Sequence, residues 1–252
     1  FLNKAFHIDD TIYLLCAKQI QTNPLDFYGS VVNWNGTDNP MYIVNQNPPL
    51  TSYALALAAC CFGWSEFSLH LCFMLVAILL VAGIYFLARF FCEYAYVAAL
   101  FCLFSPVFLV SSSNVMSDTL MLAFYVWAVV FWLNGWRDAS KMKLFISAVF
   151  ISIAFLAKYF ALSLLPLLFV YTLCQERKLG WWILFLVLPL FVVAGYQLIT
   201  YTLYNNLLLT NAASYALSHG TATNVSKLVH KAFTGFSFVG GCMIGALFYS
   251  HL

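Results

Sequence analysis

Two adjacent carboxylates, Asp9 and Asp10, stand in the stretch FHIDDTIYLL near the start of the chain. The whole chain has only 9 acidic residues, so this pair is conspicuous. An acidic residue at a helix N-terminus accepts backbone N–H bonds and suits the helix dipole, which accounts for one of the two. Adjacent carboxylates beside an apolar region suit general-base chemistry or cation binding. We keep both interpretations open for this pair.

Two other charged residues stand at apolar runs further along the chain. Asp118, in NVMSDTLML, opens such a run, where it can cap a helix beside Ser117. Lys158 lies inside the apolar residues 144–174, and an isolated ammonium group is costly there unless it reaches the surface or meets an anion. A carboxylate or phosphate partner would account for it. The histidines are scattered without metal-binding spacing, so no metal site is predicted.

The composition defines the surroundings of these residues. The chain is 63% hydrophobic and 8% charged, whereas soluble domains carry about 25% charged residues. This indicates an all-α integral membrane protein, a multi-span helical bundle. The net charge of +2 and the lack of a basic stripe do not support a nucleic-acid partner. The eight cysteines mostly fall in or beside apolar runs, as small hydrophobes do.

Polarity divides the chain into two regions. Residues 1–67 are predicted to form a long extracytoplasmic loop that carries the acidic motif and short surface helices, one in DDTIYLLCAKQIQTNP and one after NPPL. Residues 68–252 are predicted to form a transmembrane bundle of about six or seven spans, incomplete at both ends. The expected spans are 68–90, 95–111, 119–136, 144–174 as a hairpin, 180–204 and one from 231.

Lysine and arginine mark the cytoplasmic side of a membrane protein. Arg89, the cluster at 137–143 and the pair at 177–178 fall on one side if 144–174 turns back as two short helices. One long tilted helix is the alternative, and it would separate these clusters. With the hairpin, residues 1–67, Asp118, Lys158 and the polar loop 205–230 gather on the extracytoplasmic side.

Four short motifs in this order resemble the polyprenyl-phosphate-sugar-dependent membrane glycosyltransferases of the GT-C superfamily. That group includes the protein O-mannosyltransferases of glycosyltransferase family 39 and the lipid A aminoarabinose transferase. The resemblance covers about residues 6–175. The motifs are HIDDTIYLLCAKQI, NQNPPLTSYALAL, SSSNVMSDTLML and FLAKYFALSLLPLL.

The resemblance implies an inverting transferase that moves a sugar from a dolichyl or undecaprenyl phosphate to an acceptor hydroxyl on a protein, lipid or glycan. Asp9 would be the general base, and Asp10 would orient the acceptor or a cation. Asp118 would support them, and a divalent cation is an alternative for this acidic set. Several relatives have Lys before PPL, where this chain has Asn47. The predicted ligands of the donor phosphate are instead Lys158, His70 and Gln46.

Two other functions remain open from the sequence. An ion-coupled transporter would use Asp9, Asp10, Asp118 and Lys158 as an ion relay. The carboxylates, however, are expected at one face and not at the midplane, and no inverted repeat is visible in the sequence. A non-catalytic subunit of a glycan assembly complex is the second alternative.

Overall fold

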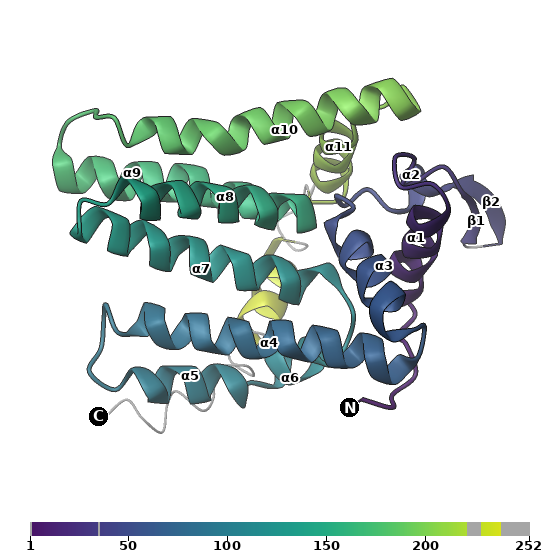
Figure 1. Cartoon of the computed structure of the whole chain (residues 1–252), viewed down its shortest axis with the longest axis horizontal. Helices are drawn as coiled ribbons and strands as arrows, with labels where there is room; N and C mark the ends of the chain where they lie inside the picture. The colour runs from purple at the N-terminus through teal and green to yellow at the C-terminus, as the bar shows by residue number, and fades with distance from the viewer. Residues whose placement is uncertain (1, 35, 221–227, 238–252) are drawn as a thin grey trace.

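The computed structural model describes residues 2–34, 36–220 and 228–237. Long helices run side by side across the molecule, and the short N-terminal elements pack across one end of them (Figure 1). We call this end, which carries α1 and α3, the site end. The predicted all-α membrane bundle is confirmed.

The first 65 residues form short elements. The two predicted helices are present as α1 (Asp10–Thr22) and α3 (Leu50–Phe62), and Pro49 occupies the N-cap of α3. Between them lie α2 (Met41–Val44) and a hairpin of two antiparallel strands, β1 (Val31–Trp34) and β2 (Thr37–Pro40). The hairpin was not expected from the sequence, because its eight paired residues include four polar side chains and a proline.

The rest of the described chain is helical. Its elements are α4 (Glu66–Ala88), α5 (Ala95–Leu103), α6 (Pro106–Ser112), α7 (Ser117–Arg137), α8 (Lys141–Ala157), the 3₁₀ helix η1 (Tyr159–Ser163), α9 (Leu164–Glu176), α10 (Ile183–Tyr204) and α11 (Leu208–Gly220).

The predicted span 95–111 is corrected by the structure. It consists of two helices, α5 and α6, which are bent by 64° at the break between them. Ser105 caps α6 by accepting a hydrogen bond from the Phe108 amide, and Pro106 follows at the first position of α6. Proline favours the start of a helix and disfavours its interior, so a new helix begins at this point.

Within the described residues, four helical segments are long and apolar enough to cross a membrane, or five if the bent pair is one span. They are α4, α7, η1 with α9, and α10. The expected number was six or seven. The difference has two sources: α8 has 17 residues and falls just short in length, and much of the span expected from 231 lies outside the described residues.

Helices α7 and α8 pack against each other in opposite directions. The Ser147 hydroxyl donates to the Ala128 carbonyl at 2.7 Å, and further along, Gly135 lies against Leu144. A later residue of α7 thus contacts an earlier residue of α8, as in two antiparallel helices. Helix α8 therefore returns from the far end of the bundle to the site end.

Helices α7 and α9, in contrast, run in the same direction. Tyr125 and Ser163 lie 3.4 Å apart, hydroxyl to hydroxyl, and the Trp132 indole donates to the Thr172 hydroxyl at 2.9 Å. Because α8 opposes α7 and α9 follows it, residues 144–174 turn back at the site end. The hairpin prediction is therefore confirmed, and Lys158 lies at its turn.

The basic clusters come together at the other end of the bundle, which we call the cationic end. The Arg137 guanidinium lies 5.4 Å from the centre of the Phe90 ring, next to Arg89. The Lys141 ammonium lies 5.1 Å from the Trp181 ring. These contacts join the C-terminal ends of α4 and α7 and the starts of α8 and α10, so Arg89, Arg137 and Lys141 lie at one end of the bundle.

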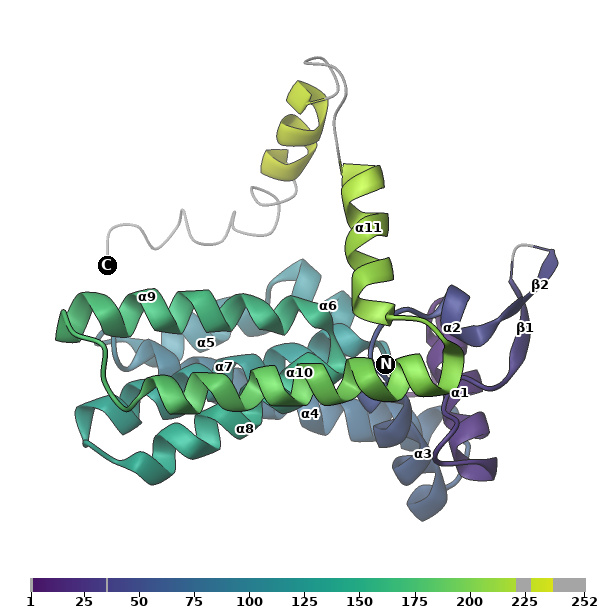
Figure 2. The same ribbon diagram turned by 90° about the horizontal axis from the view of Figure 1, so that it is seen from above.

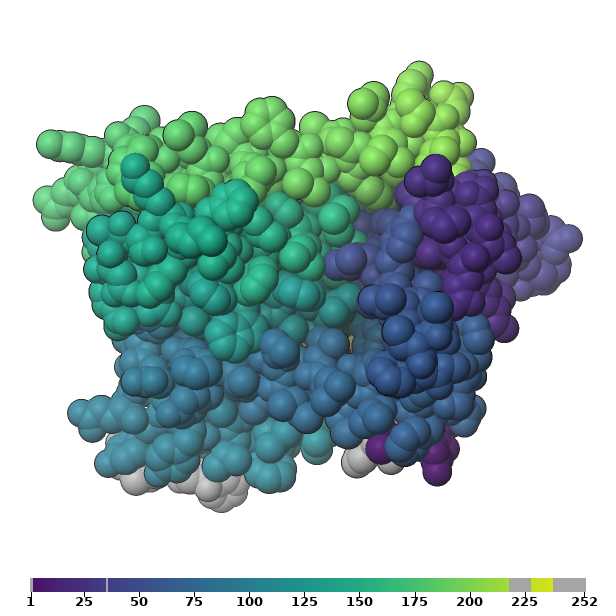
Figure 3. Space-filling model, viewed as in Figure 1, coloured from purple at the N-terminus to yellow at the C-terminus, as the bar shows by residue number. Residues whose placement is uncertain are grey.

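A shared core fixes the N-terminal elements to the site end. Ile20 from α1, Leu55 from α3 and Leu69 from α4 are buried in one cluster with Phe155 of α8. Figure 3 shows the N-terminal segments packed as a cap on the end of the helical body. The surface helices are thus part of the folded bundle and position whatever chemistry α1 carries.

Candidate active site

Asp9 occupies the N-cap position of α1, but its side chain makes no capping hydrogen bond. Its carboxylate lies 3.9 Å from His7 Nδ1, and both side chains are about half exposed, 50% for Asp9. The capping interpretation therefore does not account for Asp9. Its carboxylate is open to a molecule that arrives from water.

Asp10 is fully buried, although it is the next residue. Its Oδ2 accepts a hydrogen bond from the His7 amide at 2.8 Å, and its Oδ1 has no hydrogen-bond partner in the described part of the chain. Burial raises the pKa of Asp10, and the backbone amides of His7 and Val115 and the nearby His70 partly offset this rise. The two neighbouring carboxylates thus have opposite surroundings.

Asp118 and Lys158 form an ion pair. Lys158 Nζ lies 2.7 Å from Asp118 Oδ1, and the two side chains remain 31% and 44% exposed. Asp118 is the second residue of α7, where a carboxylate suits the helix dipole, and Lys158 is the residue between α8 and η1. Asp118 is thus a carboxylate partner of the kind that accounts for this lysine, one of the alternatives left open by the sequence.

A short chain of hydrogen bonds joins α1 to the start of α7. The Tyr13 hydroxyl lies 2.9 Å from the Ser117 hydroxyl and accepts from the Asn47 side-chain amide at 3.3 Å. Tyr13 is one helical turn after Asp10 and thus lies on the same face of α1. Ser117 precedes Asp118, so both acidic positions border one polar region.

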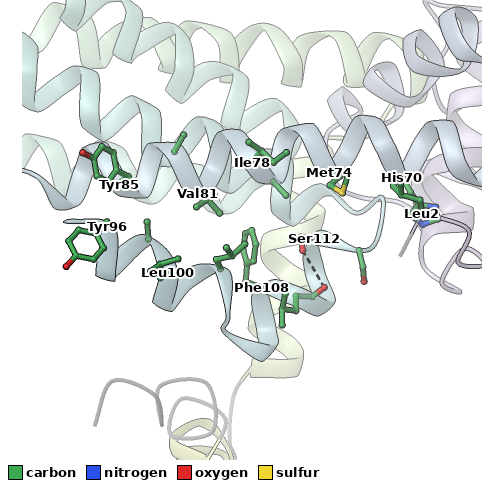
Figure 4. Close-up of a pocket in the computed structure, with 16 residues that line it drawn as sticks. Leu2, His70, Met74, Ile78, Val81, Tyr85, Tyr96, Leu100, Phe108 and Ser112 are labelled. Carbon is green, nitrogen blue, oxygen red and sulfur yellow. Dashed lines mark hydrogen bonds between the residues drawn. The ribbon is translucent and has the colours of Figure 1, made fainter. Parts of the chain in front are cut away.

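An apolar groove of about 720 Å³ begins near this region, between α4 and the bent pair α5–α6. Figure 4 shows His70 and Leu2 at one end of the groove and Tyr85 and Tyr96 at the other. From position 70 to position 85, a helix extends about 22 Å. The groove therefore runs from the site end toward the cationic end, along the membrane-spanning part of α4.

The polar end of the groove contains groups that can meet an anion. The His70 ring stacks on Phe6 at 5.1 Å, and its buried Nε2 has no hydrogen-bond partner in the described part of the chain. The Lys4 ammonium donates to Ser113, which lines the groove, at 3.4 Å and to Asn114 at 2.5 Å. Lys4 thus adds a cation to the groove end that the sequence did not single out.

The three predicted phosphate ligands do not line one cavity. His70 lines the apolar groove, Gln46 lines a second cavity, and Lys158 is paired with Asp118. Their spacing in the sequence gave no information on this, because each comes from a different element. A single phosphate does not have all three as neighbours in this conformation.

No three His, Cys, Asp or Glu side chains come together as a metal site within the described residues. The Asp9 carboxylate lies near His7 Nδ1, and the Asp118 carboxylate pairs with the Lys158 ammonium, so the two carboxylates do not share a partner. We therefore assign no metal ligands.

Comparisons with known proteins agree with this architecture. The crystal structure of ArnT from Cupriavidus metallidurans in the apo state matches with a TM-score of 0.59 and 18% identity, over 79% of this chain and 38% of that chain. The chain thus spans less than half the length of ArnT, and at this identity the match shows a shared fold. A search of curated proteins finds no match.

The family comparison covers the region from the second motif to the middle of α10. The sequence model described as dolichyl-phosphate-mannose-protein mannosyltransferase matches residues 46–198, more than half of the chain. The resemblance to the GT-C superfamily is thereby confirmed. The chain belongs to the dolichyl-phosphate-mannose-protein mannosyltransferase family of membrane glycosyltransferases.

Proposed function

We propose that the protein is an inverting glycosyltransferase that moves a sugar from a polyprenyl phosphate to an acceptor hydroxyl. One observation carries the proposal: a long apolar groove ends at cationic and imidazole groups beside a buried carboxylate. The groove suits an isoprenoid chain, and its polar end suits the phosphate that this chain carries. Family membership supports a donor of this class.

The phosphate is proposed to lie at the polar end of the groove. His70 and Lys4 are the groups nearest to it in the structure, since His70 lines the groove and Lys4 bonds to Ser113 in its wall. Lys158 remains a candidate only if its bond to Asp118 exchanges for a bond to phosphate. Gln46 lies in the other cavity, so we do not propose it as a phosphate ligand.

Asp9 is proposed as the general base. Its exposed carboxylate takes the proton of the acceptor hydroxyl while that oxygen attacks the anomeric carbon. The bond from the anomeric carbon to the phosphate oxygen breaks on the opposite face, and the phosphate leaves with the bonding electrons. Cationic groups stabilise the charge that develops on the phosphate.

Asp10 and Asp118 have supporting roles in this proposal. Asp10 is buried and lies close to His70, which lines the polar end of the groove. Asp118 fixes Lys158 beside the polar region between α1 and α7. Both are positioning residues and do not contact the reacting atoms.

The site end is proposed to face the extracytoplasmic side. Arginine and lysine at the other end of the bundle, beside Phe90 and Trp181, are typical of the cytoplasmic side. An integral membrane enzyme in this orientation receives its lipid-linked donor and its acceptor outside the cytoplasm. The acceptor is a protein, a lipid or a glycan, and a second cavity distinguishes among these classes.

The donor class can be tested with purified full-length protein in lipid nanodiscs. Sugars on undecaprenyl or dolichyl phosphate are expected to be transferred or hydrolysed, whereas the same sugars on nucleotides are not. The Lys4→Gln variant is expected to raise the donor KM about tenfold or more, and Lys18→Gln, on α1 beside Trp64, serves as the control. Turnover of nucleotide sugars alone would overturn the proposal.

A further inference from the structure

A second cavity of about 510 Å³ lies at the site end, between the N-terminal elements and α11. Trp34 of β1, Asn39 of β2 and the segment that includes Gln46 form one wall. Ala212 and Tyr215 of α11 form the other. Figure 2 shows α11 rising from the end of α10 beside α2 and the strands.

The lining has the chemistry of a site for an uncharged, polyhydroxylated ligand. It combines two aromatic rings, Trp34 and Tyr215, with the amide side chains of Asn39, Gln46 and Asn47. None of the lining residues carries a charge. Aromatic faces pack against the C–H faces of a sugar ring, and amides both donate to and accept from its hydroxyls.

Among the residues that line this cavity, Gln46 is the best placed to bind a ligand. Its side chain is half-buried, and it makes no hydrogen bond with another described residue. An amide offers two donors and an acceptor, which a bound hydroxyl group would satisfy. The same composition disfavours a carboxylate or phosphate ligand, because no cation in the lining compensates for the loss of its hydration.

A hydrogen bond links the lining of the cavity to α1, which carries the acidic pair. Asn47 lines the cavity and donates to the Tyr13 hydroxyl, and Tyr13 is one turn from Asp10 on α1. Asp10 in turn faces His70, which lines the apolar groove. One residue of the cavity, Asn47, and one residue of the groove, His70, thus both lie near the part of α1 that carries the acidic pair.

We propose that this second cavity binds an uncharged sugar residue of the acceptor, which makes the acceptor a glycan or a glycosylated molecule. The proposal rests on the proposed glycosyltransferase function, because the groove must hold the donor for the cavity to hold the acceptor. Trp34 and Gln46 are the residues that distinguish acceptors.

Direct binding can be measured without turnover. Saturation-transfer NMR on the full-length protein in nanodiscs would use methyl α-D-mannopyranoside and methyl β-D-glucopyranoside as probes, with methyl β-D-glucuronide as the charged comparison. We expect at least one neutral glycoside to show a signal that falls about fivefold or more in Trp34→Ala and in Gln46→Ala. Trp64→Ala, an indole on the same side that bonds to Gln21, is expected to leave the signal unchanged. Trp34 and Gln46 lie on different elements, so a loss of signal in both variants is not explained by misfolding of the β1–β2 hairpin alone.

Kinetics separates the acceptor from the donor as the source of the sugar. In Trp34→Ala and Gln46→Ala, the KM for a glycan acceptor is expected to rise about tenfold or more, and donor hydrolysis without acceptor is expected to keep its KM. A raised donor KM would instead assign the cavity to the donor sugar and overturn the proposal. The absence of glycoside binding in wild-type protein would also overturn it. Glycoside binding without any transfer from a polyprenyl-phosphate donor would overturn the proposed function and leave the cavity as a sugar site.

Discussion

Asp9 and Asp10 are adjacent in the sequence but occupy opposite environments. Asp9 is half-exposed beside His7, whereas Asp10 is fully buried with one oxygen unpaired among the described residues. A buried carboxylate without full hydrogen bonding lowers the stability of the folded state. Such a cost is typical of residues retained for function and not for folding.

The cost at Asp10 gives a prediction on stability. Burial raises its folded-state pKa above the ordinary 3.8, so the folded protein binds more protons than the unfolded chain between these two values. The free energy of unfolding therefore falls as the pH rises through that window.

The Asp10→Asn variant keeps an acceptor for the His7 amide and removes the titration of this side chain. We expect a higher Tm than wild type at pH 7, by thermal unfolding in detergent, and a gain that shrinks as the pH falls toward 4. A lower Tm for Asp10→Asn than for wild type at pH 7 would contradict the claim that the buried Asp10 carboxylate destabilises the folded protein.

The Asp118–Lys158 pair allows a prediction that separates function from stability. Because Asp118 is 44% exposed, the pair is expected to contribute only about 0.2–1 kcal/mol to folding, measured by a double-mutant cycle. If Lys158 exchanges its bond to Asp118 for one to the donor phosphate, Lys158→Met lowers sugar transfer about 100-fold with little change in Tm, as loss of a cationic group does. Lys178→Met, outside the site end, is the control. A large loss of stability with normal transfer per folded molecule would assign the pair a structural role.

At the scale of elements, the contact between α7 and α8 sets the position of Lys158. A Cβ added at Gly135 would lie 2.9 Å from Leu144 Cγ and 3.0 Å from its backbone nitrogen, so the two helices approach closely there. Helix α8 then continues to the site end and presents Lys158 to Asp118. Close packing far from the site thus supports the geometry at the site.

Two matched glycine variants test this packing. Gly135→Ala is expected to destabilise the protein by about 1–3 kcal/mol, because the backbone of α8 must move. Gly195→Ala, on α10, meets no atom within 4 Å, and the better helix propensity of alanine is expected to stabilise it by about 0.5–1 kcal/mol. Equal Tm values for the two variants in detergent would contradict the close approach of α7 and α8.

The sequence was informative on elements whose pattern is local. Most helices could be located from the periodicity of α1, the prolines before α3 and the apolar runs. The positions of Arg137 and Lys178 indicated that residues 144–174 form a helical hairpin. The bend at Pro106 was missed because the apolar run continues through it. The strands around Trp34 were missed because their pairing, and not their composition, defines them.

The site was only partly predictable, because local sequence signals identify single residues but not the contacts between distant ones. Asp9, Asp10, Asp118 and Lys158 attract notice because charges are rare in this chain. Tyr13 carries no such signal, since tyrosines are frequent here, and Lys4 was not singled out because it precedes the acidic motif. Which candidate ligands share a cavity depends on tertiary packing, which no spacing in the sequence determines.

At the scale of the whole molecule, the two ends of the bundle differ in chemistry. One end gathers the acidic pair, the ion pair and the two cavities, and the other gathers arginine and lysine beside aromatic rings. A chain of this kind is oriented in the membrane by its cationic end. The groove between α4 and α5–α6 extends from the first end toward the second.

This asymmetry predicts the reactivity of single cysteines. In a background without native cysteines, Asn206→Cys, at the site end after α10, is expected to react with a membrane-impermeant maleimide added outside intact cells. Lys178→Cys, at the cationic end, is expected to react only after the membrane is permeabilised. The reverse pattern would place the site end in the cytoplasm and contradict the proposed orientation.

The central claim is that Asp9 is the base for sugar transfer from a polyprenyl phosphate. The most direct measurement is the rate of transfer by the full-length Asp9→Asn protein in nanodiscs, with Asp138→Asn, at the cationic end, as the matched control. We expect Asp9→Asn to lower kcat about 100- to 10,000-fold, while the Tm and the donor affinity stay close to wild type. Unchanged transfer in a folded Asp9→Asn protein would contradict it.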